Sequence, residues 1–189
     1  MSKMDEEMSR KIYQYLCNII GTEEVVKTRR KIFCELDSVI QITNISVLSS
    51  GSKAEGLDLK GSDYDHMHVY EMFQVYENKR KVLFFANKIP IVMDISDTKP
   101  GFTKLKLYNQ RHVYESDISQ WVEIEEGETY ISSKLFREDG LLDNMIIHGP
   151  CQSVRNETYD CAFCLRCKEW ITPARQWVFR SRSAWPDDR

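Results

Sequence analysis

The sequence lacks a run of about 18 consecutive apolar residues, so it predicts no membrane-spanning helix. Its first residues, MSKMDEEMSRK, contain charged side chains and no apolar stretch, which argues against a secretory signal peptide. An excess of one charge is also absent: 26 basic and 29 acidic residues give a net charge of −3, which excludes a chain-wide basic surface for nucleic acid. We therefore expect a cytoplasmic or nuclear protein with no membrane partner.

Internal repeats and low-complexity linkers are missing as well. The composition, 42% hydrophobic and 29% charged, is ordinary for a globular domain and excludes a disordered or fibrous chain. The 189 residues suffice for one domain with a core, or for the larger part of a two-lobed protein. The six cysteines, without a secretory signal, predict reduced thiols.

Hydrophobic periodicity predicts helices at the start of the chain. Apolar residues recur at helical spacing in residues 3–20, and Gly21 follows at the expected end. Thr22 then indicates the start of a second amphipathic helix, which continues to about residue 41. We assign 1–41 to an N-terminal amphipathic helix or helix pair, and 42–189 to the core domain.

The rest of the chain predicts an α+β domain around one mixed sheet. Alternating patterns indicate a strand at 42–50 and another at 63–73, and a hairpin or two strand pieces within 81–96. Short strands are predicted after the Pro-Gly turn at 100–101 and at 157–165, a mostly helical segment at 126–149, and a helix at 171–185 entered through Pro173.

The stretch GSKAEGLDLKGSDYD, residues 51–65, carries the chemistry. Gly51-Ser52 is followed, after ten residues, by Asp63 and Asp65 with Tyr64 between them. On a strand the two carboxylates project from one face, about 6.6 Å apart along the chain. Carboxylates so placed can bind Mg²⁺ (or Mn²⁺), which keeps open positions for phosphate oxygens. The Gly-Ser turn offers close backbone approach and N–H donors for a triphosphate.

This spacing resembles the nucleotidyltransferase signature of the polymerase-β-like superfamily. The long N-terminal helix, PGFTKL at 100–105, HGPC at 148–151 and the late YDCAFCL…WITPARQW…WP further resemble the Mab (male-abnormal) family. That family includes cyclic GMP–AMP synthase and the cyclic GMP–AMP synthase-like receptors, and the resemblance covers nearly the whole chain. It implies a polymerase-β-like core with a mixed twisted sheet, flanking helices and a long N-terminal helix. We expect the family's C-terminal helical lobe to be missing, because the sequence ends at WPDDR.

The resemblance implies roles for individual residues. Asp63, Asp65 and a third carboxylate would be catalytic and hold two Mg²⁺ ions, with Gly51 and Ser52 on the nucleotide triphosphate. Asp160 matches the position of the third acid, and Asp94 is the rival. The implied reaction joins ATP and GTP into a cyclic dinucleotide in nucleic-acid sensing of innate immunity. Double-stranded RNA or DNA would be the activator, and the basic run KTRRK offers candidate contacts, namely Lys27, Arg29, Arg30 and Lys31.

Each of these interpretations has an alternative. The protein as a whole could be a catalytically inactive Mab-type binding or interaction module, a truncated fragment, or a nucleotidyltransferase with a linear product. The aspartates could be a solvated strand end, Ser52 a helix N-cap, and KTRRK a solvated helix face. We expect Tyr64 in the core and His66 and His68 as structural residues rather than metal ligands. We expect buried or half-buried thiols rather than a zinc site at Cys161, Cys164 and Cys167.

Overall fold

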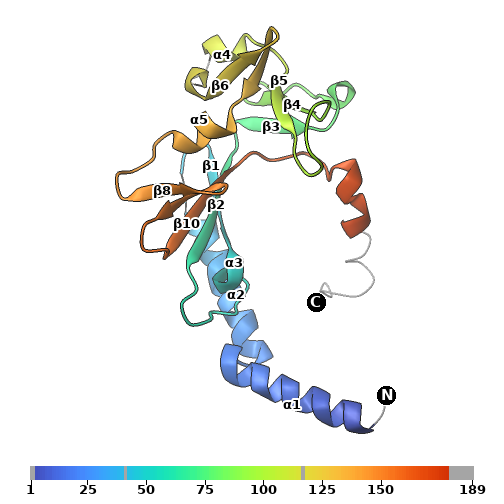
Figure 1. The fold of residues 1–189 in the computed structure, drawn as a ribbon, viewed down its shortest axis with the longest axis vertical. Coiled ribbons are helices and arrows are strands. Elements are labelled where there is room, and N and C mark those ends of the chain that lie inside the picture. Colours follow the sequence, from blue (N-terminus) through green and yellow to red (C-terminus); the bar gives the residue numbers. More distant parts are fainter. Residues whose placement is uncertain (1–2, 41, 116–117, 179–189) are drawn as a thin grey trace. The chain divides into compact units, whose positions relative to one another are not determined.

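The computed structural model describes residues 3–40, 42–115 and 118–178 (Figure 1). The chain divides into two compact units: Met1–Val69 with Gly140–Cys164, and Tyr70–Asp139 with Leu165–Arg189. The α+β class is confirmed, but the strands form two five-stranded mixed sheets instead of the single expected sheet. In the described part of the chain, no helix has both the length and the hydropathy needed to cross a membrane.

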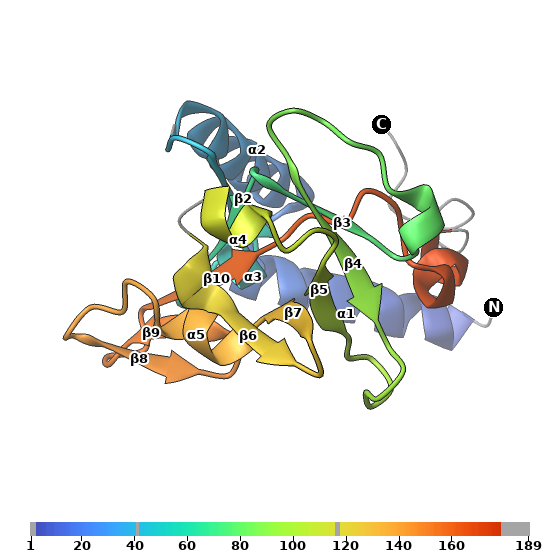
Figure 2. The same ribbon diagram turned by 90° about the horizontal axis from the view of Figure 1, so that it is seen from above.

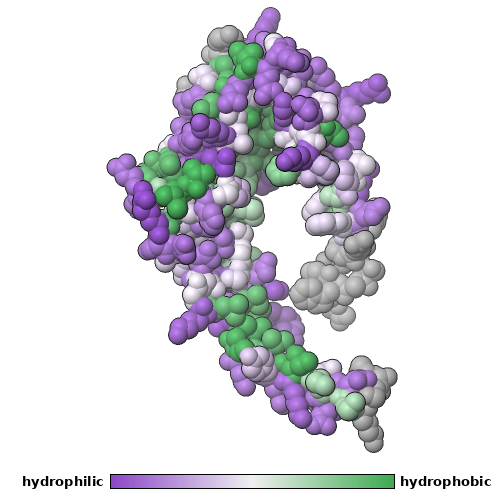
Figure 3. Space-filling model, viewed as in Figure 1, coloured by the Kyte–Doolittle hydropathy of each residue, from purple (hydrophilic) through white to green (hydrophobic). Residues whose placement is uncertain are grey.

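The two predicted N-terminal helices are confirmed as α1 (Lys3–Ile20) and α2 (Glu23–Val39). Thr22 is the N-cap of α2, and its side chain accepts a hydrogen bond from the Val25 amide. The apolar stripe of α1 stays 45–73% exposed, and Figure 3 shows it as a green band along this helix. Its residues are Met4, Met8, Ile12, Leu16 and Ile19. The periodicity thus predicted the helix correctly, but the described residues do not bury its apolar face.

The sheet of the first unit has the strand order β1-β2-β10-β9-β8. β2 lies parallel to β10, while β10 with β9, and β9 with β8, are antiparallel. The parallel pairing brings strands together that are far apart in the sequence. The strands are β1 (Ile45–Ser50), β2 (Tyr64–Tyr70), β8 (Met145–His148), β9 (Cys151–Val154) and β10 (Tyr159–Cys164), and the short helix α3 (Gly51–Ala54) follows β1 directly.

The sheet of the second unit has the order β3-β4-β5-β7-β6, and Figure 2 shows β4, β5, β7 and β6 in succession. Four aromatic rings pack beside it with centroids 5.1–6.4 Å apart: Tyr70, Phe73, Trp121 and Phe136. The strands are β3 (Phe73–Tyr76), β4 (Ile89–Asp94), β5 (Lys104–Leu107), β6 (Val122–Glu125) and β7 (Glu128–Ile131). The helical segments are η1 (Lys79–Lys81), α4 (His112–Glu115), η2 (Ser119–Trp121), α5 (Ser133–Glu138) and η3 (Thr172–Ala174).

Several local predictions were wrong. The segment 126–149 is not mostly helical: it contains β7, the short α5 and β8, because its apolar residues pair across strands rather than along one helix face. No strand forms at 82–88, and β4 begins only at Ile89. Tyr64 is 47% exposed rather than core. The predicted helix at 171–185 starts with η3 and continues to residue 178, and its remainder lies outside the described residues.

Candidate metal centre

Three carboxylates of the first unit converge at one end of the β2–β10 pair. Asp65 lies on β2, Asp63 immediately precedes that strand, and Asp160 lies on β10 directly opposite Asp65 in the parallel register. One oxygen of each carboxylate lies within 4.8 Å of the others, and all three residues are half-buried. No other group of three or more His, Cys, Asp or Glu side chains in the described ranges meets this spacing. Oxygen ligands at this spacing suit a hard divalent cation.

The surroundings of Asp65 disfavour the ionised form of its carboxyl. Burial raises the pKa of the Asp65 carboxyl, and the negative charges of Asp63 and Asp160 raise that pKa further, while His66 opposes them. Neighbouring carboxylates resist ionising together, and a divalent cation between them reverses that effect. The three carboxylates could therefore hold a divalent cation.

Gly51 packs directly against this triad. Its φ of +68° lies in the left-handed region, and a Cβ at this position would be 1.7 Å from the Asp65 Oδ2 atom. The neighbouring Ser50 hydroxyl donates to the main-chain carbonyl of Asp65 at 3.4 Å. The Gly-Ser turn and the aspartates, ten residues apart in the sequence, are therefore in contact, and only glycine fits at position 51.

Ser52 lies inside α3 and does not cap it, since Ser50 occupies the N-cap position. The N-cap interpretation of Ser52 was therefore wrong. The Ser52 hydroxyl donates to the Ser62 hydroxyl at 3.0 Å, which joins α3 to the end of the loop that precedes β2. The Lys53 ammonium lies 3.6 Å from the ring centroid of Tyr64, so a cation also stands beside this loop.

Asp94, the rival for the third acid, has a different environment. It ends β4 in the second unit, and its carboxylate accepts hydrogen bonds from the Ser96 amide at 3.1 Å, the Ser96 hydroxyl at 2.6 Å and the Tyr130 hydroxyl at 3.0 Å. These donors, Ser96 first, lower the pKa of the Asp94 carboxyl. Asp160, not Asp94, is the acid that the structure brings beside Asp63 and Asp65.

His66 and His68 follow Asp65 on β2, on the opposite face of the strand, and pack among aromatic rings. Their ring centroids are 6.3 Å apart, Tyr159 meets His66 edge-on at 5.2 Å, and Phe163 meets His68 at 5.6 Å. Burial lowers the pKa of His68, and His66 adds to this effect. This packing favours the structural interpretation of both histidines. Cys161 on β10 is buried and Cys164 and Cys167 are half-buried, as predicted, and burial raises the pKa of the Cys161 thiol to about 11.

Sequence reasoning missed Cys151 as a neighbour of the triad. Cys151 on β9 pairs with Ala162 on β10, and Ala162 is two residues from Asp160. The side chains of Cys151 and Asp160 therefore lie on the same face of the sheet. Burial raises the pKa of the Cys151 thiol, and Asp160 and Asp65 raise it further. The HGPC segment marked this position, but only the β9–β10 register shows what lies beside it.

Three side chains of the basic run on α2 make contacts within the chain. The Arg29 guanidinium donates to the carbonyls of Ile20 at 2.6 Å and Gly56 at 3.1 Å, and Arg30 donates to the Glu55 carbonyl at 2.7 Å. Lys27 forms an ion pair with Glu23 at 2.7 Å, one turn away. These contacts tie α2 to the end of α1 and to the loop after α3. Of the four candidates for nucleic-acid contact, Arg29 and Arg30 therefore have structural roles.

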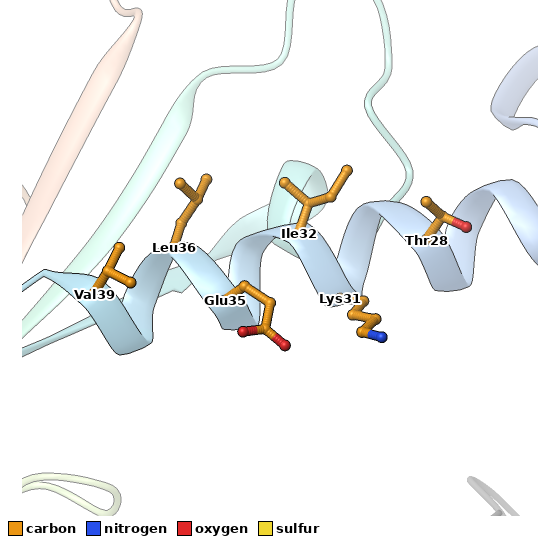
Figure 4. A pocket seen from close by; sticks show the side chains of 6 residues that line it. All are labelled: Thr28, Lys31, Ile32, Glu35, Leu36 and Val39. Carbon is orange, nitrogen blue, oxygen red and sulfur yellow. The ribbon is translucent and has the colours of Figure 1, made fainter.

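Lys31 instead lines a shallow groove along α2 of about 400 Å³. Figure 4 shows the apolar side chains of the groove on one side of the helix, with Lys31 and Glu35 on another. The apolar residues are Ile32, Leu36 and Val39, all exposed.

The chain was compared with known proteins at three levels. No family model matches it, and searches of the curated proteins and of the solved structures returned no significant match.

Proposed function

We propose that the protein is a polymerase-β-like nucleotidyltransferase domain that binds nucleoside triphosphates with Mg²⁺ (or Mn²⁺) at Asp63, Asp65 and Asp160. The observation that carries this proposal is the convergence of three carboxylates against the Gly51-Ser52 turn. A strand end with chance acids has no reason to bring Asp160 from β10 to the same point. The order turn, α3, loop and acid-bearing strand within 51–65 adds support.

The three carboxylates would hold the cations, which supply charge neutralisation for the transferred phosphate and for the departing pyrophosphate. The lack of a side chain at Gly51 leaves room for the Asp65 carboxylate, which brings the backbone of the Gly-Ser turn beside the proposed triphosphate site. Ser52 would contribute its hydroxyl to the same triphosphate. Asp160 is the candidate to accept the proton of an attacking ribose hydroxyl. In its full form the reaction would join ATP and GTP into a cyclic dinucleotide with release of pyrophosphate, activated by double-stranded RNA or DNA.

The direct test is a pyrophosphate-release assay with ATP, GTP and Mg²⁺, with and without duplex RNA or DNA. We expect release from the wild-type chain, or from the chain with a helical lobe appended, and loss of release in Asp160→Asn. Asp94→Asn is the matched control, since it removes the same charge from a carboxylate outside the triad. Release that survives Asp160→Asn, or no release from either wild-type protein, would count against the proposed reaction.

A second candidate is a non-enzymatic module of the same fold. The observation that favours it is the uncovered apolar stripe of α1, because exposed apolar faces are typical of interaction surfaces. Thermal unfolding with ATP or GTP separates the two candidates. A Mg²⁺-dependent rise in Tm supports a nucleotide site, and the absence of any shift favours the interaction module.

A further inference from the structure

The connection between β3 and β4 carries an exposed apolar tip. Leu83, Phe84 and Phe85 are 49%, 69% and 50% exposed, and they are consecutive. We call residues 79–88 the Phe84 loop. Single exposed apolar residues are common on protein surfaces, but three adjacent large ones form a patch that indicates contact with another surface.

The loop is held in a defined conformation. The Tyr76 hydroxyl donates to the Leu83 carbonyl at 2.9 Å, and the Lys88 amide donates to the Phe85 carbonyl at 3.1 Å. The Phe84 ring makes an edge contact with Tyr108, with centroids 5.2 Å apart. These contacts fix the backbone of the loop while the apolar side chains of its tip stay exposed to solvent.

Cations surround this tip. The loop contains Lys79, Arg80, Lys81 and Lys88, and the acid in the rest of the β3–β4 connection is Glu77, whose carboxylate accepts hydrogen bonds from the Thr172 amide and hydroxyl. Lys81 is paired with Glu169 at 2.9 Å and Lys88 with Glu71 at 3.3 Å.

Two loop cations and a neighbour outside the loop are not neutralised in this way. The Lys168 ammonium lies 5.9 Å from the Phe85 ring centroid, and that of Lys79 lies 5.9 Å from Tyr108. Within the described ranges, no ion pair within 4.0 Å joins a carboxylate to Lys79, Arg80 or Lys168, and the Glu169 carboxylate interacts electrostatically with Lys168. The patch therefore combines apolar side chains with an excess of positive charge, which fits an anionic partner that also offers an apolar layer.

A lipid bilayer fits these features better than a single-stranded nucleic acid does. Base stacking needs open aromatic faces, and Lys168 lies over one face of the Phe85 ring. Leu83 has no aromatic ring on which a base could stack, but its apolar side chain can enter a membrane interface as the two phenylalanines can. Anionic headgroups attract nearby Lys and Arg while apolar side chains enter the acyl boundary.

We propose that the Phe84 loop binds anionic phospholipid surfaces. Leu83, Phe84 and Phe85 enter the interface, and Lys79, Arg80 and Lys168 contact the lipid phosphates. This is peripheral contact through a loop, which requires no membrane-spanning helix, and it departs from the sequence-based expectation of no membrane partner. It is independent of the nucleotidyltransferase proposal, because every residue that carries it belongs to the second unit.

The test is sedimentation of the full chain with phosphatidylcholine vesicles, with and without phosphatidylserine. We expect binding only to the anionic vesicles, decreasing as salt is raised. The double variant Phe84→Ser/Phe85→Ser should bind about tenfold more weakly, and Lys79→Glu/Arg80→Glu at least as weakly. The matched control is Phe102→Ser/Ile124→Ser, which removes two side chains that are 71% and 75% exposed elsewhere in the same unit. Its binding should equal that of the wild type.

Three results would overturn the proposal. The first is no binding to anionic vesicles by a wild-type chain with a cooperative thermal transition. The second is an equal loss of binding in the control and loop variants, because general surface hydrophobicity would then explain the binding. The third is binding of a single-stranded oligouridine, lost in Phe84→Ser/Phe85→Ser, without vesicle binding, which would assign the loop to nucleic acid instead.

Discussion

Asp65 on β2 and Asp94 at the end of β4 differ in what their neighbours supply. In the described part of the structure no donor contacts the Asp65 carboxylate, two other carboxylates converge on it, and its pKa is raised. The Asp94 carboxylate accepts three hydrogen bonds, and its pKa is lowered. The hydrogen-bonded Asp94 carboxylate stabilises the folded protein. The Asp65 carboxylate lies among like charges and could bind a cation.

The largest expected effect on stability comes from Gly51→Ala. The new Cβ would overlap the Asp65 carboxylate and strain a backbone with φ of +68°, so we expect the free energy of unfolding to fall by about 2–4 kcal/mol. Gly61→Ala is the control, because Gly61 also has a positive φ of +85° but no atom lies within 4 Å of its would-be Cβ. It should cost about 1 kcal/mol. Urea unfolding measures both, and equal losses would show that Gly51 does not press on Asp65.

Asp94→Ala tests how much the hydrogen-bonded Asp94 carboxylate contributes to stability. It removes an acceptor of three hydrogen bonds, and we expect a loss of about 1–2 kcal/mol. Because the folded pKa of Asp94 is lowered, its contribution is present above the ordinary value of 3.8 and is lost as the pH falls through the folded pKa. Urea unfolding from neutral to acidic pH measures this, and a difference between variant and wild type that does not shrink in acid would contradict it.

Asp65→Asn should change the free energy of unfolding least, and it should raise it, whereas the two preceding substitutions lower it. Without divalent cations it relieves repulsion within the triad, so we expect a gain of a few tenths to about 1 kcal/mol at neutral pH. The folded pKa of Asp65 is raised, so the ionised carboxylate lowers the free energy of unfolding of the wild type. This loss of stability is complete above the folded pKa and disappears as the pH falls through it toward 3.8. Mg²⁺ should reverse the order of the two proteins. Thermal unfolding in EDTA and in Mg²⁺ provides the comparison, and a less stable variant in EDTA would refute the repulsion.

Sequence patterns predicted the parts of the fold that depend on local interactions. The 3.6-residue period predicted α1 and α2, and Thr22 marked the start of α2, because capping and amphipathicity act within a few residues. The segment 126–149 was mispredicted because its short strands form only through partners elsewhere in the chain, β5 and β6 for β7, and β9 for β8. Short apolar runs do not specify such pairing.

The same limit applies to the candidate site. The spacing in 51–65 predicted that Asp63 and Asp65 lie together, because alternation on a strand is local. The choice of Asp160 over Asp94 came from a resemblance, and the physical reason, the parallel β2–β10 register, is visible only in three dimensions. The backbone contacts of Arg29 and Arg30 were likewise unpredictable, since a charged run on a helix does not show which carbonyls lie opposite it.

Cation binding by the triad is tested most directly by titrating the protein with Mn²⁺ and measuring the free ion by electron paramagnetic resonance. We expect the wild-type chain to bind Mn²⁺ and Mg²⁺ to compete for the same site. Asp63→Asn, Asp65→Asn and Asp160→Asn should each weaken binding at least about tenfold, while Asp94→Asn leaves it unchanged. A wild-type chain that leaves Mn²⁺ free, or an Asp160→Asn variant that binds as tightly as the wild type, would contradict a shared cation site at these three carboxylates.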